Sequence, residues 1–207
     1  MAFLSNPARA LPPIARAAPT DRAALVATLS AAFVDDPAMA WIMPDRADRL
    51  RRLPRLFDLL TGEDLTEGWC LASPGCEAVT LWRAGASIHT SPWQLLRGLP
   101  GFLSALGPNL LRALAMSGAI EAHHPNDLAY DYLHFAGVDP AFQGRGWGGA
   151  AIRAGIEQAR SKGRPIYLET ATPENIGLYQ RLGFAVTQEW DVPRGGPHFW
   201  SMLWQPD

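Results

Sequence analysis

The sequence predicts a single α/β (α+β) domain, with one central sheet flanked by helices, and three observations support this. The length of 207 residues is enough for one domain with a substantial core but not for two full domains. A composition of 48% hydrophobic and 18% charged residues is typical of a compact, folded chain. The C-terminal half shows the patterns of strand, loop, helix, strand, helix, strand and strand in that order, which indicates layers built on one sheet.

The N-terminal half predicts helices with one early strand. We expect a loose Ala/Pro-rich tail over residues 1–12 and the folded domain over 13–207. Hydrophobic residues recur at helical spacing in the segment 22–33, and we expect Pro37 to stop that helix. A second helix is expected within 46–60, where Pro54 must end or kink it.

The middle of the chain predicts a hairpin followed by helices. Two strand patterns, at 69–72 and 78–82, flank a Pro-Gly turn, which is a typical hairpin signal. The apolar run that follows is interrupted by prolines and arginines, so it indicates helices rather than a membrane span. We expect a helical insertion over about 90–122, between the third and fourth strands.

The overall charge excludes some partners. A net charge of −2 offers no electrostatic footprint for nucleic acid or an anionic membrane, so an anionic ligand must be held by a local site. The N-terminus lacks a signal-peptide pattern, and two cysteines, Cys70 and Cys76, fit free thiols in a reducing cytoplasm. The five histidines show no ligand spacing, and we expect no metal.

A glycine-rich loop follows the predicted strand DYLHFAGV. Gly144, Gly146 and Gly149 satisfy G-x-G-x-x-G, and glycines before a helix let a phosphate approach the backbone N–H groups and the positive end of the helix dipole. Glu169, at the end of the next strand, has the position of a ribose-binding acid in a dinucleotide fold.

Two features count against a dinucleotide site. The segment DPAFQ separates the strand from Gly144, and Pro140 imposes an extended excursion where a dinucleotide fold has a tight turn. The chain after Glu169 is also too short for the rest of a doubly wound sheet.

The whole phrase resembles another phosphate-binding segment. A strand ending in Gly-Val and followed by x-P-x-x-Q-G-x-G-x-G resembles the acetyl-CoA-binding segment of the GCN5-related N-acetyltransferase (GNAT) superfamily. A second landmark of that superfamily, N-x-x-x-Y-x-x-x-G-F, is present as Asn175, Tyr179, Gly183 and Phe184. The C-terminal part is most similar to puromycin N-acetyltransferase-like members, and the likeness is weakest over about 83–121.

This resemblance implies a fold, a co-substrate and a set of site residues. It implies a single GNAT-type domain with a mixed sheet and splayed strands four and five, which transfers the acetyl group of acetyl-CoA to a primary amine. The residues expected to bind coenzyme A are Gly137, Val138, Gln143, Gly144, Arg145, Gly146, Trp147, Gly148, Gly149, Asn175 and Tyr179. Tyr179 is the expected general acid. A general base is expected on the strand before the loop, where alternation places Tyr132, His134, Ala136 and Val138 on one face. His134 is preferred because imidazole titrates in the right range, and Glu169 is the second candidate.

The acceptor site is open to more interpretations. Asp35 and Asp36 could attract a cationic amine or simply form a turn, and Trp41 and Trp93 could line the pocket or the core. His123 and His124 could line the acceptor pocket, although adjacent histidines in a polar loop are more typically exposed. We expect a small antibiotic- or metabolite-like amine as acceptor and a monomer or homodimer. The alternatives are a protein or peptide N-acetyltransferase and a non-catalytic module that binds coenzyme A.

Overall fold

The computed structural model describes residues 11–85 and 92–206, with the side chains of 92–97 not described. Most of the tail expected over 1–12 and the Trp93 side chain therefore lie outside the described part. The strands are β1 (Ala15–Arg16), β2 (Trp69–Ala72), β3 (Ala78–Ala84), β4 (Asp131–Val138), β5 (Ile166–Thr170), β6 (Ala185–Asp191) and β7 (His198–Trp204). The α-helices are α1 (Arg22–Ala32), α2 (Pro37–Ile42), α3 (Arg46–Glu67), α4 (Pro92–Leu106), α5 (Leu110–His123), α6 (Trp147–Ser161) and α7 (Pro173–Arg181).

The strands form one mixed seven-stranded sheet in the order β1-β2-β3-β4-β5-β7-β6. Neighbouring strands pair antiparallel except β4 and β5, which are parallel and are joined through α6. The predicted fold class, a single α/β domain with a mixed sheet, is confirmed. The hairpin is also confirmed, because β2 and β3 pair antiparallel across the Pro-Gly turn.

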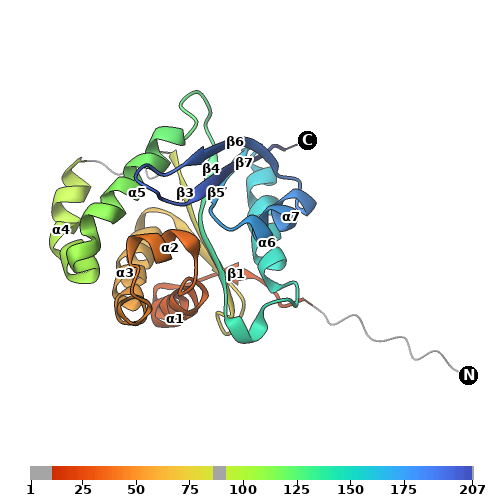
Figure 1. Ribbon diagram of the computed structural model, residues 1–207. Helices are drawn as coiled ribbons and strands as arrows, with labels where there is room; N and C mark the ends of the chain where they lie inside the picture. The colour runs from red at the N-terminus through yellow and green to blue at the C-terminus, as the bar shows by residue number, and fades with distance from the viewer. Residues whose placement is uncertain (1–10, 86–91, 207) are drawn as a thin grey trace, which may run out of the picture.

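The two faces of the sheet are covered by different helices (Figure 1). On one face, Leu29 of α1 and Phe57 of α3 belong to the same buried cluster as Leu81 of β3. On the other face, Ile156 of α6 packs in a cluster with Trp82, the next residue of β3. Adjacent strand residues point to opposite faces, so a strand covered on both sides is mostly apolar, as β3 is apart from Thr80 and Arg83.

Neither Pro37 nor Pro54 ends a helix. Helix α3 does not end at Pro54, which lies inside it, because Leu53 and Phe57 on either side are fully buried. Burying each such side chain contributes about 1.5–3 kcal/mol, which offsets the cost of an internal proline of about 3 kcal/mol. Pro37 is the first residue of α2, where the N–H group that proline lacks would have no partner within the helix. Asp36 caps α2 by accepting a hydrogen bond from Met39 N at 3.0 Å.

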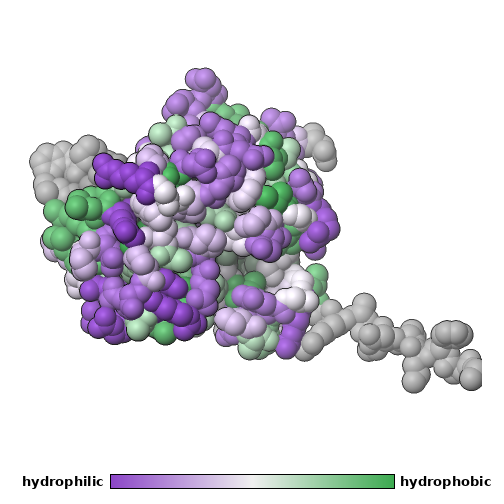
Figure 2. All heavy atoms as spheres, viewed as in Figure 1, coloured by the Kyte–Doolittle hydropathy of each residue, from purple (hydrophilic) through white to green (hydrophobic). Residues whose placement is uncertain are grey.

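Helices occupy the segment between β3 and β4, as expected. α4 packs against α3, and α5 packs against α2. Four leucines are exposed here, and Figure 2 shows a hydrophobic area over α4 at the left of the molecule. These leucines are Leu99, Leu103, Leu111 and Leu114.

Candidate active site

The parallel strands β4 and β5 pair only at their beginnings. Over the described residues, the ladder joins Asp131 to Ile166 and Tyr132 to Tyr167. β4 then continues to Val138 and β5 to Thr170, but in the described part of the chain no further residues of these two strands pair with each other. The two strands therefore diverge toward their C-terminal ends, and the backbone edge of β4 is turned toward the opening. Ligands bind at such carboxyl ends in open α/β sheets.

The glycine loop begins where β4 ends. Gln143 Nε2 donates a hydrogen bond to the carbonyl oxygen of Val138 at 3.1 Å, which ties the loop back to the strand. Gly144 and Gly146 have φ values of 70° and 81°, which glycine adopts without strain. A methyl group added to Gly144 would meet no atom within 4 Å, and one added to Gly146 would meet only Leu11, at 3.2 Å.

The loop leads directly into the first turn of α6. Gly146 is the N-cap of α6 and has no side chain that could satisfy the N–H groups of the first turn. Trp147, Gly148 and Gly149 are the first residues of the helix, so their N–H groups have no acceptor within the helix and lie at the positive end of the helix dipole. This arrangement suits an anionic ligand such as a pyrophosphate.

Arg145 of the loop and Gly137 of β4 both make close packing contacts. The Arg145 guanidinium lies 5.4 Å from the centre of the Phe142 ring, at the rim of the loop. A methyl group at Gly137 would lie 3.0 Å from Leu29, so glycine there allows α1 to approach β4 closely. The sheet also excludes the doubly wound dinucleotide fold, because β5 is followed in the sheet by antiparallel strands.

Tyr179 and Asn175 lie one turn apart on α7, on the same side of the sheet as α6. The Tyr179 side chain is buried, with its ring centre 5.8 Å from that of Phe184. Burial, with a smaller contribution from the negative charge of Asp36, raises the pKa of Tyr179 to about 12. The hydroxyl group therefore keeps its proton at neutral pH, which is the state a proton donor needs.

His134 is the extra residue of a β-bulge. In the β3–β4 ladder, Leu81 pairs with Phe135 and Trp82 pairs with Leu133, so His134 has no partner on β3. A bulge re-aims side chains, and the alternation expected for β4 breaks here. Ala136 packs on the α6 side of the sheet, whereas His134 points to the α3 side. The expectation that both share a face is wrong.

His134 contacts a buried ion pair. Its Nδ1 lies 2.7 Å from Oδ2 of Asp64, a fully buried residue of α3, and Arg83 Nε donates a hydrogen bond to the other oxygen. Burial works against ionisation of Asp64, but His134 and Arg83 outweigh it and hold its pKa below the usual range. Burial lowers the pKa of His134, although the contact with Asp64 acts in the opposite direction.

Glu169 lies in a separate cluster of buried polar side chains. Its carboxylate lies 3.0 Å from His124 Nε2, and His124 Nδ1 lies 2.9 Å from the Tyr130 hydroxyl oxygen. Burial and the neighbouring Glu169 carboxylate together raise the pKa of Tyr132 and of Tyr167. The expectation that His124 lies in an exposed loop is wrong, because α5 extends to His123 and carries the next residue into this cluster.

The two aspartates before α2 have different environments. Asp35 is exposed and forms an ion pair with Arg46 at 3.0 Å. Asp36 is the N-cap described above, and burial raises its pKa. The backbone at these aspartates forms the expected turn between α1 and α2. The negative charge of Asp36 also contributes to the raised pKa of Tyr179.

Comparison with known proteins agrees with this geometry. Residues 114–184, which include the glycine loop and Tyr179, match the model of the Acetyltransferase (GNAT) family. A solved structure described as histone acetyltransferase HPA2 and related acetyltransferase from Corynebacterium glutamicum superimposes with a TM-score of 0.72 at 24% identity, covering 96% of this chain and 98% of that one. The chain has the GNAT fold.

Two further solved structures are similar over nearly the whole chain. Arylalkylamine N-acetyltransferase 2 from Aedes aegypti gives a TM-score of 0.66 at 14% identity, covering 94% of this chain and 99% of that one. A polyamine N-acetyltransferase from Drosophila melanogaster gives 0.55 at 15% identity, covering 93% and 99%. The match over residues 114–184 and these neighbours agree on the fold.

The candidate site contains charged residues that the sequence did not single out. Asp64 and Arg83 meet His134 although they are far from it in sequence. One signal was available for Asp64: an acidic residue near the C-terminal end of a helix opposes the helix dipole and needs another reason to be there. Among the described residues, no group of three or more potential metal ligands is found, and none of the helices described could cross a membrane.

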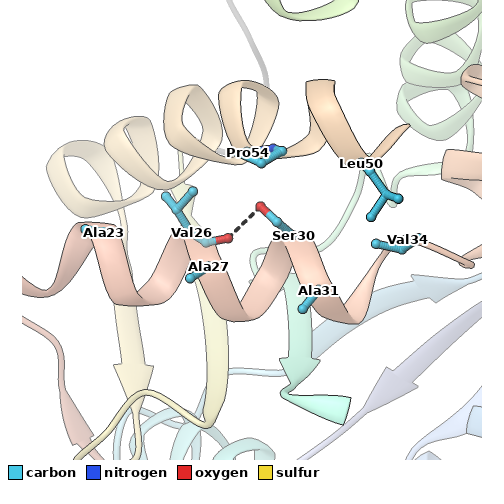
Figure 3. Close-up of a pocket in the computed structure, with 8 residues that line it drawn as sticks. All are labelled: Ala23, Val26, Ala27, Ser30, Ala31, Val34, Leu50 and Pro54. Carbon is cyan, nitrogen blue, oxygen red and sulfur yellow. Dashed lines mark hydrogen bonds between the residues drawn. The ribbon is translucent and has the colours of Figure 1, made fainter. Parts of the chain in front are cut away.

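A groove of about 440 Å³ lies between α1 and α3. Figure 3 shows the residues that line it. Its lining is apolar apart from Ser30, whose hydroxyl donates a hydrogen bond to the carbonyl oxygen of Val26 at 2.6 Å. No titratable side chain is among the described residues that line this groove.

Proposed function

We propose that this protein is an N-acetyltransferase that transfers the acetyl group of acetyl-CoA to a primary amine of a small molecule. The observation that carries the proposal is the divergence of β4 from β5 beside a glycine-lined helix N-terminus. Tyr179 and His134 approach this region from opposite faces of the sheet. Acyl transfer needs a positioned thioester, a proton acceptor and a proton donor, and this arrangement offers a candidate for each.

The residues present fit the phosphate portion of coenzyme A. The space that a Cβ atom would fill is open at Gly144 and is approached only by Leu11 at Gly146, and the first N–H groups of α6 have no acceptor within the helix. We assign pyrophosphate binding to the loop from Gln143 to Gly149, with Arg145 adding positive charge. Gly137 and Val138 would offer backbone groups to the pantetheine arm, and Asn175 and Tyr179 would face it from α7. When bound, acetyl-CoA supplies the acetyl group as a thioester.

Two side chains would move protons. Tyr179 would give its proton to the leaving thiolate, because its raised pKa keeps it protonated until the sulfur takes up negative charge. His134 would accept the proton of the amine, because burial favours its neutral form. Glu169 is the second candidate for this role. Its carboxylate is nearly buried beside His124, Tyr132 and Tyr167, and this favours His134 as the base.

The acceptor class rests on two considerations. The arylalkylamine and polyamine enzymes among the structural neighbours are named for small amines. The helices α4 and α5 pack against α3 and α2 beside the acceptor side and would narrow an open peptide groove. The C-terminal likeness to puromycin N-acetyltransferase-like members makes an antibiotic- or metabolite-like amine a part of the proposal.

The free, buried thiols of Cys70 and Cys76 fit a cytoplasmic location.

Two alternatives differ from this proposal in what they predict. A protein N-acetyltransferase is suggested by the neighbour described as a histone acetyltransferase, and it would acetylate peptides in preference to free amines. A non-catalytic module would bind coenzyme A without turnover. The presence of a protonated, buried tyrosine beside the opening favours catalysis, because binding alone needs no proton donor.

Thiol release from acetyl-CoA with a panel of amines, puromycin included, and a panel of peptides tests the proposal. We expect release with one or more small amines and little with peptides. Release with peptides alone would favour the protein acetyltransferase. Binding of acetyl-CoA with no release in either panel would favour the non-catalytic module. The variants His134→Ala and Glu169→Gln then distinguish the two candidate bases. The variant that loses the acid limb of the pH–rate profile identifies the base.

A further inference from the structure

Asp64 connects α3 to the two central strands. Its side chain is fully buried near the C-terminal end of the helix. Oδ2 lies 2.7 Å from His134 Nδ1 on β4, and Oδ1 accepts a hydrogen bond from Arg83 Nε on β3. Arg83 also pairs with Glu63 at 3.1 Å, so its charge is shared between two carboxylates. Each Asp64 oxygen therefore has a charged or polar partner.

These contacts decide which ring nitrogen of His134 carries the proton. A buried carboxylate beside an arginine is ionised, and an ionised carboxylate can only accept hydrogen bonds. The contact at 2.7 Å therefore requires a proton on Nδ1 of His134. In a neutral imidazole the other nitrogen, Nε2, then holds the free electron pair.

We propose that Asp64 is a positioning residue that fixes the His134 tautomer and aims Nε2 at the acceptor amine. The inference rests on the proposed function, in which His134 is the base. As the new carbon–nitrogen bond forms and the carbon–sulfur bond breaks, the amine proton moves to Nε2 and the leaving thiolate takes the proton of Tyr179. The resulting imidazolium lies against the Asp64 carboxylate, which stabilises its charge. Asp64 is not itself the base, because it is fully buried and His134 and Arg83 occupy its oxygens.

The β-bulge gives His134 this orientation. As the unpaired residue of β4, His134 turns toward α3, while Leu133 before it packs on the α6 side. The groups that act on the charge of His134 are Asp64 from α3, Arg83 from β3 and Glu169 from β5, and the ring of Tyr132 lies 5.5 Å away, centre to centre. Asp64 is the one that contacts the ring nitrogen directly.

Nitrogen NMR of the ¹⁵N-histidine-labelled enzyme tests the tautomer without any change to Asp64. His134→Gln serves only to assign the resonances. Above the pKa of His134, we expect a protonated Nδ1 and an unprotonated Nε2. A neutral His134 with its proton on Nε2 would overturn the proposal. This measurement does not need turnover, so it remains decisive even if the proposed function fails in the thiol-release assay.

The variant Asp64→Asn tests the consequence for catalysis. The asparagine amide can donate to Nδ1 and so favours a proton on Nε2, and we expect kcat to fall roughly 10²- to 10⁴-fold, the usual contribution of a general base. The KM for acetyl-CoA should stay near the parental value. Loss of the carboxylate should also move the acid limb of the residual pH–rate profile to lower pH, because His134 loses the charge that stabilises its imidazolium form.

Glu63→Gln is the matched control. It removes the second partner of Arg83 but leaves the Asp64–His134 contact in place, so we expect the parental tautomer and kcat. Parental kcat and pH profile in Asp64→Asn would overturn the proposal. So would a fall in kcat with an unchanged pH profile and tautomer, since that result means a structural role. If Asp64→Asn does not fold, the NMR result on the parental protein decides.

Discussion

The indole ring of Trp82 lies against the backbone of Gly155, so close that a methyl group added to Gly155 would be 2.0 Å from the ring. Trp82 is fully buried on β3, and its Nε1 donates a hydrogen bond to Thr80 Oγ1 at 2.8 Å. Gly155 lies in α6, which carries the glycine loop at its N-terminus. This contact therefore sets the height of α6 above the sheet and with it the position of the loop.

Replacing Gly155 by Ala should destabilise the fold. The ring cannot move away in a packed core, so we expect the free energy of unfolding to fall by about 1–3 kcal/mol. Urea denaturation measures this. Gly118→Ala is the control, because Gly118 lies in α5 with no atom within 4 Å of an added methyl group, and it should stabilise by about 0.5–1 kcal/mol. Equal effects of the two substitutions would show that the Trp82 contact is unimportant.

Replacing Gly146 by Ala should weaken binding of acetyl-CoA. Alanine at a φ of 81° is strained by about 1–2 kcal/mol, and its methyl group enters the proposed pyrophosphate cradle. We expect the KM for acetyl-CoA to rise roughly tenfold, which corresponds to about 1.4 kcal/mol of binding free energy, with a smaller effect on kcat. Gly163→Ala, at the other end of α6, carries similar strain at a φ of 62° in open space. It should lower stability but leave the KM unchanged; a matching rise in KM would argue against the cradle.

Replacing Tyr179 by Phe should remove the proton donor and little else. The phenyl ring keeps the packing against Phe184, so the fold should hold. We expect kcat to fall roughly 10²- to 10⁴-fold while the KM for acetyl-CoA changes little. Steady-state thiol release measures both constants. Turnover equal to that of the parent would exclude Tyr179 as the general acid.

The pH–rate profile should report His134. A base works only when it is deprotonated, and the pKa of His134 is lowered from its ordinary value of 6.5 by burial. Activity should therefore be retained at neutral pH and fall only as the pH drops through the lowered pKa. His134→Ala should lose this acid limb together with most of kcat, measured at saturating amine. An acid limb that persists in His134→Ala but disappears in Glu169→Gln would assign the base to Glu169.

Local patterns in the sequence predicted much of the fold. The strand DYLHFAGV has the predicted bounds, and Pro173 and Gly183 mark the start and the end of α7 as their backbone preferences require. The position of the glycine loop between β4 and α6 was also predicted, because its glycines are adjacent in the sequence. The length of α3 was not predicted, since tertiary packing around Pro54 overrides the local cost of proline.

The polar partners of the site could not be predicted. Asp64 lies 70 positions before His134, and only the pairing of β3 with β4 and the packing of α3 bring them together. The bulge that turns His134 toward Asp64 depends on a register shift between β3 and β4. The alternation of residues within one strand cannot reveal such a shift. His124 was expected to be exposed because its sequence neighbours are polar, whereas the aromatic side chains that bury it come from β4 and β5.

Product analysis tests the central claim most directly. The protein would be incubated with acetyl-CoA and the amine that releases the most thiol, and the acceptor examined by mass spectrometry and NMR, with Tyr179→Phe in parallel. The account predicts an acetyl group on the amine nitrogen, formed in equal amount to free coenzyme A and strongly reduced in the variant. Thiol release without an acetylated amine, or equal product from the variant, would contradict it.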